Sequence, residues 1–282
     1  MRAGVGFVTI PGVGIAGIVR GVMDFWFPWA CAVCKAGFEG SGPLCAACAG
    51  ALQKLEDEPH CAVCAASLPM HRSPCPYCRG KGAPNFERVV RLTSYHDPVR
   101  VMIRNLKYHR GWGVGEELAG RLLGRESVKA LLQETQVLVA VPLHWRRQLI
   151  RGYNQADVIA RWLGRECRIP VARPVRRVRN TETQTHLHSH AKREKNLREA
   201  FALVDGRAIA GRHVTVVDDV WTTGATLQAM ARVMKQARPA SLSAIVVAVA
   251  DQRGVERGSG SRCANYRLRR RCRWRARRLH GR

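Results

Sequence analysis

The sequence is poor in acidic residues. It has 21 Asp and Glu against 47 Lys and Arg in 282 residues, which gives a formal net charge of +26. Such a balance favours polyanionic partners, meaning nucleic acid or phosphate-rich ligands. Aromatic residues are also scarce, at 6%, which leaves few side chains for stacking along the bases of a nucleic-acid strand. Val, Leu, Ile and Ala are plentiful, so the class is globular rather than disordered.

Long apolar runs are missing as well. None reaches the roughly 18 residues that a membrane span needs. Residues 3–19 are apolar but rich in Gly and broken by Pro11, and the Asp24, Trp26 and Phe27 that follow do not form a clean cleavage site. We therefore expect a cytoplasmic protein, in a compartment where paired cysteines more often bind metal than each other.

Composition divides the chain into four segments. Residues 1–29 are an apolar and aromatic lead, residues 30–80 hold eight of the eleven cysteines, and residues 85–250 alternate strand and helix patterns. Residues 251–282 form an Arg-rich tail without apolar periodicity, which we expect to be disordered. Two interpretations of the tail stay open: a basic arm for nucleic acid, or a frameshifted or read-through end.

The cysteine segment is an internal repeat. CAVCKAGFEGSGPLCAAC (31–48) is followed by CAVCAASLPMHRSPCPYC (61–78), and each unit holds two CxxC pairs. One CxxC offers two thiolates to a metal, and a second completes a tetrahedral set of four. The pattern predicts two zinc ions with a structural role, because four thiolates leave no open coordination position. The simplest ligand sets are Cys31, Cys34, Cys45 and Cys48, and Cys61, Cys64, Cys75 and Cys78.

Two alternatives remain for these cysteines. The two units could interleave their ligands, and iron–sulfur clusters are a second metal class, although the spacing is not that of ferredoxins. Cys167, Cys263 and Cys272 stand alone, and we expect them to be incidental.

Residues 85–250 predict an α/β fold. The runs 136–141, 213–218 and 241–250 are continuous apolar strands. Helical spacing of apolar residues follows Asp97-Pro98 and recurs over 156–163 and 227–237. Continuous apolar strands that alternate with helices indicate a parallel sheet covered on both faces. Ligands of such sheets bind beyond the carboxyl ends of the strands.

The segment HVTVVDDVWTTGAT (213–226) lies at such an end. Two carboxylates at the end of a buried strand suit the 2- and 3-hydroxyls of a ribose and can help hold Mg²⁺, directly or through water. The threonines, the glycine turn and the helix start offer donors to a phosphate. An ordinary strand-to-helix turn with capping residues is the alternative. The predicted site residues are Asp218 and Asp219, which we expect to be catalytic, and Thr222, Thr223, Gly224, Ala225 and Thr226.

This segment resembles the phosphoribosyl pyrophosphate signature of type I phosphoribosyltransferases. More narrowly, the chain is similar to the ComF/GntX family, which is linked to DNA uptake or to the use of DNA as a nutrient. The likeness runs from MDFWFPWAC (23–31) to residue 250. It includes LKYHRGW (106–112), VPLHWRRQLIRGYNQA (141–156), RVRNTETQ (177–184) and KREKNLREAF (192–201). It implies a type I phosphoribosyltransferase-like sheet behind a double zinc ribbon.

The resemblance also implies roles for two basic segments. Arg146, Arg147 and Arg151 would lie in the loop that meets the pyrophosphate, and a solvated basic loop is the alternative. Residues 177–196 would be a mobile cover over the site. Its residues that match the family pattern include Arg179, Gln184, Arg193 and Asn196.

Other polar residues near these segments are weaker candidates. His186, His188 and His190 lie outside the family pattern, and we expect a solvated loop there. Lys107 and Arg110 either line an anionic site or are surface charges.

Two functions compete. The first is transfer of a phosphoribosyl group, with Mg²⁺ and arginines neutralising the pyrophosphate that leaves. The second is a binding protein that uses the same pocket without catalysis and handles single-stranded DNA, with a competence helicase as a further partner. The sequence does not identify an acceptor base, and it leaves open whether any group is transferred.

Overall fold

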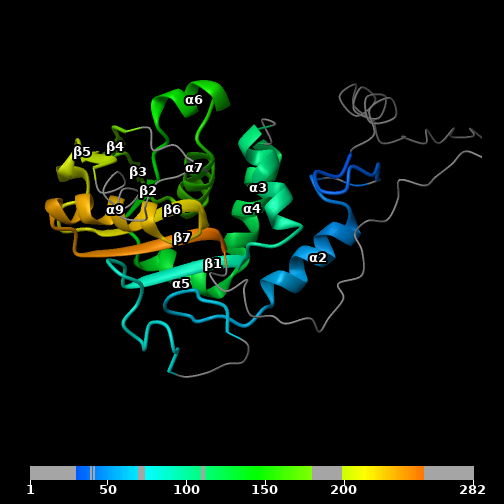
Figure 1. Cartoon of the computed structure of the whole chain (residues 1–282), viewed down its shortest axis with the longest axis horizontal. Coiled ribbons are helices and arrows are strands. Elements are labelled where there is room, and N and C mark those ends of the chain that lie inside the picture. The colour runs from blue at the N-terminus through cyan, green and yellow to red at the C-terminus, as the bar shows by residue number, and fades with distance from the viewer. Residues whose placement is uncertain are drawn as a thin grey trace, which may run out of the picture. The chain divides into compact units, whose positions relative to one another are not determined.

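The computed structural model describes residues 30–38, 40, 42–68, 74–108, 112–179 and 199–250. At its centre is a five-stranded sheet whose neighbouring strands all pair in parallel (Figure 1). This confirms the parallel sheet expected for an α/β fold. The strand order is β1 (Arg88–Ser94), β7 (Ser241–Val249), β6 (His213–Trp221), β2 (Val137–Ala140) and β3 (Val171–Ala172).

Helices cover both faces of this sheet. On one face, the apolar residues of the strands share a core with α3 (Val99–Tyr108), α4 (Trp112–Gly124), α5 (Glu126–Glu134) and α7 (Gln155–Cys167). The core on the other face contains α9 (Ala225–Met234) and the antiparallel pair β4 (Val175–Arg177) and β5 (Phe201–Leu203). Two short 3-10 turns, Gly206–Ala208 and Lys235–Ala237, flank this second layer.

The apolar periodicity of the sequence accounts for the helices. In α3, Val99, Met102, Ile103 and Leu106 are fully buried on one stripe. In α7, the side chain of Asn154 caps the first turn by accepting from the N–H of Ala156 at 3.2 Å. The strands are apolar on both faces because both faces are covered.

The two cysteine units lie against the edge strand β1. The second unit continues the backbone pairing, because the N–H of Val89 donates to the carbonyl of Val63 at 2.8 Å. The buried Arg91 of β1 donates to Ser67 Oγ at 2.7 Å. The edge that would otherwise be exposed is therefore covered.

The first cysteine unit joins the helical core instead. Cys31, Cys48 and Leu52 are part of that core. Its helix α2 (Ala46–Glu56) ends on the buried Glu56, which Arg121 of α4 contacts at 2.9 Å. An ion pair between partly buried side chains thus fixes α2 against α4.

Two local expectations were wrong. The strand predicted for 213–218 continues to Trp221, because β7 pairs with β6 as far as Val249 opposite Trp221. Its buried part does end at Val217, as expected. The arginine loop contains a short helix, α6 (Trp145–Arg151), none of whose residues is buried. Among the described residues, no helix is long and apolar enough to cross a membrane.

Candidate functional site

The acidic pair lies on the open edge of β6. Strand β2 pairs with β6 only as far as Ala140 opposite Val217, so within the described part of the chain β7 alone pairs with β6 from Asp218 onward. Asp219 forms an ion pair with Lys107 of α3, with Nζ 2.6 Å from Oδ2. Alternation along the strand points Asp218 to the other face, where its carboxylate lies in the electrostatic field of Arg177.

Asp218 is the perturbed member of the pair. Burial and the charge of Asp219 raise its pKa from 3.8 to about 7. A bond from the N–H of Asp219 to Asp218 Oδ1, at 2.9 Å, and the charges of Lys107 and Arg177 oppose this rise. The pKa of Arg177 is lowered by burial and by the neighbouring charge of Arg147.

The loop after β6 has the turn that the sequence predicts. Gly224 has a φ of 73° and precedes the first residue of α9, Ala225. A Cβ at Gly224 would lie 2.5 Å from the indole of Trp221, so both the backbone angle and the space require glycine. The N–H of Ala225 donates to Thr223 Oγ1 at 3.4 Å. Thr222, Thr223 and Gly224 therefore form the loop, and Ala225 and Thr226 open the helix.

The three arginines of α6 have different contacts. Arg146 stacks on the exposed indole of Trp145, with its guanidinium carbon 5.3 Å from the ring centroid. Arg151 donates to Gln155 Oε1 at 3.2 Å, which ties α6 to α7. Arg147 lies close enough to Arg177 to lower the pKa of Arg177. Of the three, Arg147 therefore has the electrostatic link to the acidic pair.

The start of α6 is strongly positive. His144 caps this helix by accepting from the N–H of Arg146. Its pKa is lowered by burial and by the charges of Arg146, Arg177 and Arg147. A site with this field attracts anions.

The cover segment is described only at its ends. Arg179 pairs with Glu199, with guanidinium nitrogen and carboxylate oxygen 2.6 Å apart, across the point where the chain leaves and re-enters the described structure. Gln184, Arg193 and Asn196 lie outside the described residues, as do Arg110 and the three histidines.

Sequence reasoning missed two residues of this site and did not decide on a third. Arg177 stands at the start of a motif from which only later residues were chosen, and Trp221 was not singled out among the residues of its segment. Lys107 was a candidate for an anion site, but the structure places it on a carboxylate. The sequence did offer one signal, because Lys107 is the basic residue in the last turn of the otherwise apolar face of α3.

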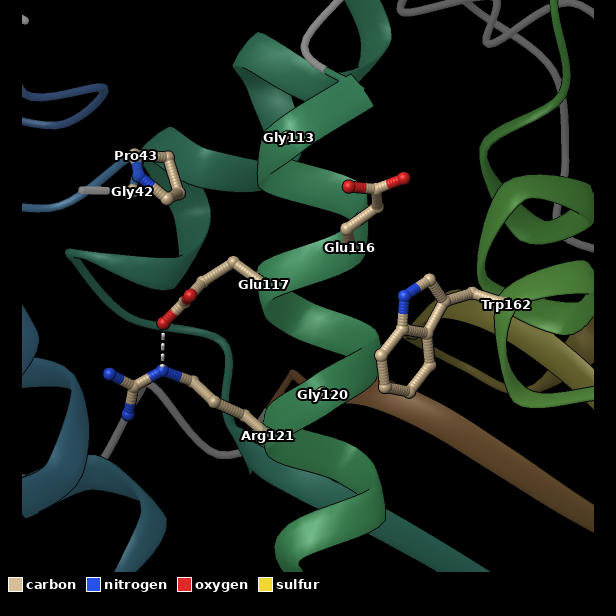
Figure 2. Close-up of a pocket in the computed structure, with 8 residues that line it drawn as sticks. All are labelled: Gly42, Pro43, Gly113, Glu116, Glu117, Gly120, Arg121 and Trp162. Carbon is tan, nitrogen blue, oxygen red and sulfur yellow. Dashed lines mark hydrogen bonds and ion pairs between the residues drawn. The ribbon is translucent and has the colours of Figure 1, made fainter. Parts of the chain in front are cut away.

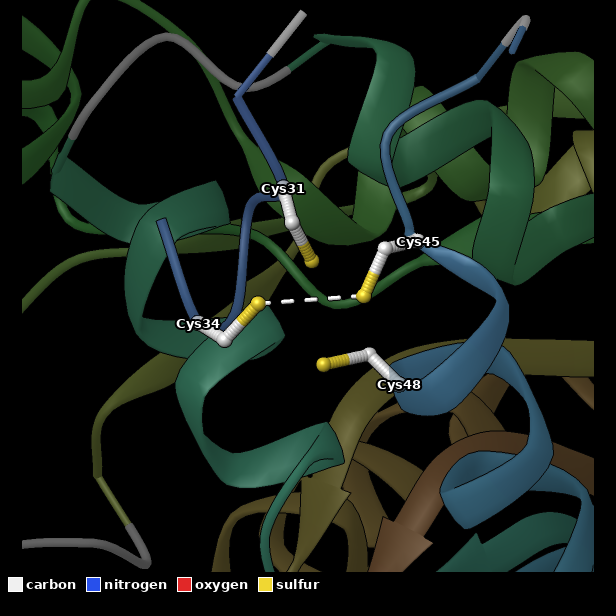
Figure 3. A group of neighbouring side chains, drawn as sticks. All are labelled: Cys31, Cys34, Cys45 and Cys48. Atoms are coloured by element: carbon white, nitrogen blue, oxygen red, sulfur yellow. Dashed lines mark hydrogen bonds between the residues drawn. The ribbon is translucent and has the colours of Figure 1, made fainter. Parts of the chain in front are cut away.

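Both cysteine sets have the geometry of a zinc site. In each set the four sulfurs lie within 4.8 Å of one another, and Figure 3 shows the first set converging on one point. The Sγ atoms of Cys34 and Cys45 are 3.7 Å apart, and those of Cys64 and Cys75 are 3.8 Å apart. A tetrahedron with Zn–S bonds of about 2.3 Å has edges of about 3.8 Å. The sets are the simple ones, without interleaving.

Local donors favour thiolates in both sets. In Cys31, burial raises the thiol pKa, but hydrogen bonds from the backbone at Cys45, Cys34 and Val33 lower it to about 6. Cys75 behaves alike, with a pKa of about 7. Burial and neighbouring sulfurs raise the pKa of Cys48 and Cys64. Four thiolates in one place need a cation, which zinc supplies.

A cavity of about 540 Å³ lies apart from these sites. Figure 2 shows Glu117 and Arg121 on the side of α4 that faces Pro43, and Glu116 on the side of Trp162. Glu117 is bonded to Arg121 at 2.6 Å. None of the predicted site residues lines this cavity, so it adds nothing to the phosphate site.

The zinc assignment predicts two metal ions per chain, and the two sites should contribute unequally to thermal stability. We expect Cys48→Ser to lower the Tm by roughly 10 °C or more, because the first set is part of the main core and each kcal/mol costs about 2–4 °C. Cys75→Ser should cost less, since its cluster is small and separate. Metal analysis and thermal unfolding check this. Iron in place of zinc, or equal losses in Tm, would contradict it.

The raised pKa of Asp218 predicts a pH-dependent cost in stability. The pKa of this carboxyl is near 3.8 in the unfolded chain and about 7 in the folded protein. The free energy of unfolding of the wild type therefore falls as the pH rises between these values, and it falls no further above them. The free energy of unfolding of Asp218→Asn, relative to that of the wild type, should therefore increase by about 2 kcal/mol from pH 5 to pH 7 and stay level above pH 7.

Thermal unfolding of both proteins from pH 5 to pH 8 measures this difference. The exposed Asp205→Asn is the control, and its difference from the wild type should stay flat. A flat difference for Asp218→Asn too would mean that Asp218 ionises as an ordinary carboxyl.

Comparison with known proteins agrees with this architecture. Residues 149–263 match the phosphoribosyl transferase domain, and residues 22–80 match the double zinc ribbon domain. "Competence protein F" of Haemophilus influenzae is 32% identical over 67% of this chain and 84% of its own length. "DNA utilization protein YhgH" of Salmonella typhimurium is 36% identical over 68% and 83%.

Among solved structures, the glutamine phosphoribosylpyrophosphate amidotransferase of B. subtilis matches 51% of this chain and 30% of its own, at 19% identity and a TM-score of 0.34. The two domain matches and the relatives at 32% and 36% identity establish the relationship. The chain belongs to the competence protein F (ComF/GntX) family, with a phosphoribosyltransferase-type α/β domain and a double zinc ribbon.

Proposed function

We propose that this protein binds phosphoribosyl pyrophosphate or ribose 5-phosphate at the carboxyl end of β6, in the cytoplasm. The observation that carries the proposal is that Asp218 and Asp219, on the open strand edge, are followed along the chain by the glycine turn at the start of α9. Backbone N–H groups and the positive end of α9 would bind the 5-phosphate, with the threonine hydroxyls as further donors. The carboxylates would bind the ribose hydroxyls.

The pyrophosphate would face the basic side of the site. Arg147 and Arg177 lie together there, and a doubly charged group would relieve their mutual repulsion. The oxygen donors of the aspartates suit Mg²⁺, which in phosphate sites keeps several waters and binds mainly through the phosphates of the ligand. Mg²⁺ would supply neutralisation of the leaving pyrophosphate.

Transfer would break the bond between C1 of the ribose and the pyrophosphate oxygen, which leaves with the electron pair. A nitrogen of the acceptor base would form the new bond to C1 and lose its proton. The residues of this chain would hold the sugar between the aspartates and the phosphate loop, which fixes C1 relative to the acceptor. The acceptor base is the part of the reaction that experiment has to supply.

The direct test follows ligand binding and pyrophosphate release together. With phosphoribosyl pyrophosphate, Mg²⁺ and a panel of bases, we expect calorimetric binding, and we expect at least a 10-fold loss of affinity in Asp218→Ala/Asp219→Ala. Release of pyrophosphate with one of the bases establishes the enzyme. Binding without release leaves a binding protein, and no binding by the wild type contradicts the proposal.

Single-stranded DNA is a second candidate ligand, favoured by the surface of α6. Trp145, Leu149 and Ile150 are 57%, 74% and 82% exposed. On a helix, Trp145 and Leu149 share one face and Arg146 with Ile150 the next. A base could stack on the exposed indole in place of Arg146, whose guanidinium would then contact a phosphate. The names of the relatives, with competence and DNA utilisation, agree with this.

The α6 surface predicts a salt-dependent affinity with one aromatic anchor. We expect Trp145→Ala to weaken binding of an oligo-dT strand about 10-fold, the cost of one lost stack, while the slope of log affinity against log salt stays unchanged. Tyr77→Ala, another exposed aromatic, is the matched control and should change little. Fluorescence anisotropy between 50 and 300 mM salt measures both. A flat salt dependence would exclude this candidate.

A further inference from the structure

Lys107 and Asp219 form a close ion pair at the proposed site. Lys107 Nζ lies 2.6 Å from Asp219 Oδ2, and the two side chains are 25% and 13% exposed. A pair this sheltered is screened less by salt than a surface pair. Lys107 also lies in the electrostatic field of Asp218. One ammonium thus serves both carboxylates.

Lys107 is held in this position by the packing around it. The three apolar residues Val99, Ile103 and Leu106 anchor α3 in the helical core. The hydroxyl of Tyr153 donates to the carbonyl of Leu106, which ties the last turn of α3 to the segment that leads into α7. The ammonium is therefore delivered to the strand edge by a fixed helix end.

The other face of β6 brings a second cation. Arg177 of β4 lies in the field of Asp218 and is itself close to Arg147. The acidic pair is thus flanked by cations from α3 on one face of the sheet and from β4 on the other. A divalent cation that took Asp219 as a direct ligand would share this carboxylate with Lys107, and it would enter a site where two cations already flank the acidic pair.

We propose that Lys107 is the resident counter-ion of the acidic pair and takes the place that a directly bound metal would have on Asp219. It is a positioning residue: it holds the Asp219 carboxylate oriented toward the ribose hydroxyls. Ribose 5-phosphate therefore binds without Mg²⁺, which is needed only with the pyrophosphate group. This inference rests on the proposed sugar-phosphate site.

The charge balance explains what loss of Lys107 would do. Without the ammonium, Asp218 and Asp219 repel each other and the incoming phosphate. A free carboxylate at Asp219 then offers an oxygen ligand to Mg²⁺. A methionine at position 107 keeps the apolar stem and removes only the charge, and an arginine restores it.

The test is isothermal titration calorimetry of the full chain with ribose 5-phosphate, in EDTA and in 5 mM Mg²⁺. For the wild type, we expect Kd values within about 3-fold of each other in the two buffers. For Lys107→Met, we expect at least a 10-fold loss in EDTA that Mg²⁺ largely restores. Lys107→Arg should bind like the wild type, and Lys129→Met, which breaks an exposed pair, should also leave both Kd values unchanged.

Each outcome decides between the two ideas. Wild-type binding that requires Mg²⁺ overturns the role of Lys107 while leaving the proposed site intact. So does a Lys107→Met protein that behaves like the wild type in both buffers, or one that Mg²⁺ does not restore. Absence of ribose 5-phosphate binding by the wild type in both buffers overturns the proposed site itself, and the inference with it.

Discussion

The site depends on the unequal lengths of two neighbouring strands. Strand β2 ends at Ala140, opposite Val217, whereas β6 and β7 continue together to Trp221 and Val249. One edge of β6 is therefore without a strand partner over its last four residues, where the two aspartates lie. The chain that leaves β2 passes this edge, where the N–H of Val141 donates to the carbonyl of Val217, and leads to His144 and α6, which lie in the electrostatic field of Arg177. A longer β2 would cover the edge and remove the site.

Much of this arrangement could be predicted from local pattern. The turn after β6 was predictable because Gly224 is the residue that such a turn needs, between a buried strand and an amphipathic helix. The cysteine sets were predictable because CxxC spacing fixes ligand geometry locally. Asn154 as a helix cap was likewise readable from its neighbours. These features depend on residues close together in sequence.

The rest depended on contacts between distant segments. Lys107 precedes Asp219 by more than a hundred residues, and nothing near Lys107 in the sequence indicates a carboxylate partner. The extension of β6 beyond Asp218 follows from pairing with β7, which the apolar pattern of β6 alone does not report. The helix α6 was missed because its apolar residues face outward. A helix is predicted from a stripe of apolar residues that face a core, so a helix whose apolar residues are exposed is not predicted in this way.

The two cysteine units show how context separates two segments with the same cysteine spacing. Both begin with CAVC, yet Cys31 is part of the main core while Cys61 belongs to a small cluster of its own. The difference follows from what comes next in the chain. The first unit leads into α2, which lies against β1 and forms an ion pair with Arg121 of α4, whereas the second is followed by β1 and shares a backbone hydrogen bond with it. One metal site thus supports the core, and the other protects a strand edge.

The charges around β6 also bear on the choice between an enzyme and a binding protein. The carboxylates lie at the strand edge, the cations Lys107 and Arg177 flank them, and Arg147 extends the positive field toward α6. A ligand with a neutral hydroxylated centre and anionic groups at its ends would fit this arrangement of charges. Its hydroxyls would contact the two carboxylates, and its phosphates would contact the cationic side chains. A continuous strand of DNA presents phosphates at every sugar and would meet the acids as well. Under the proposed function, the acidic pair would therefore bind a single sugar phosphate, and DNA would bind at the outer surface of α6 rather than at the acidic pair.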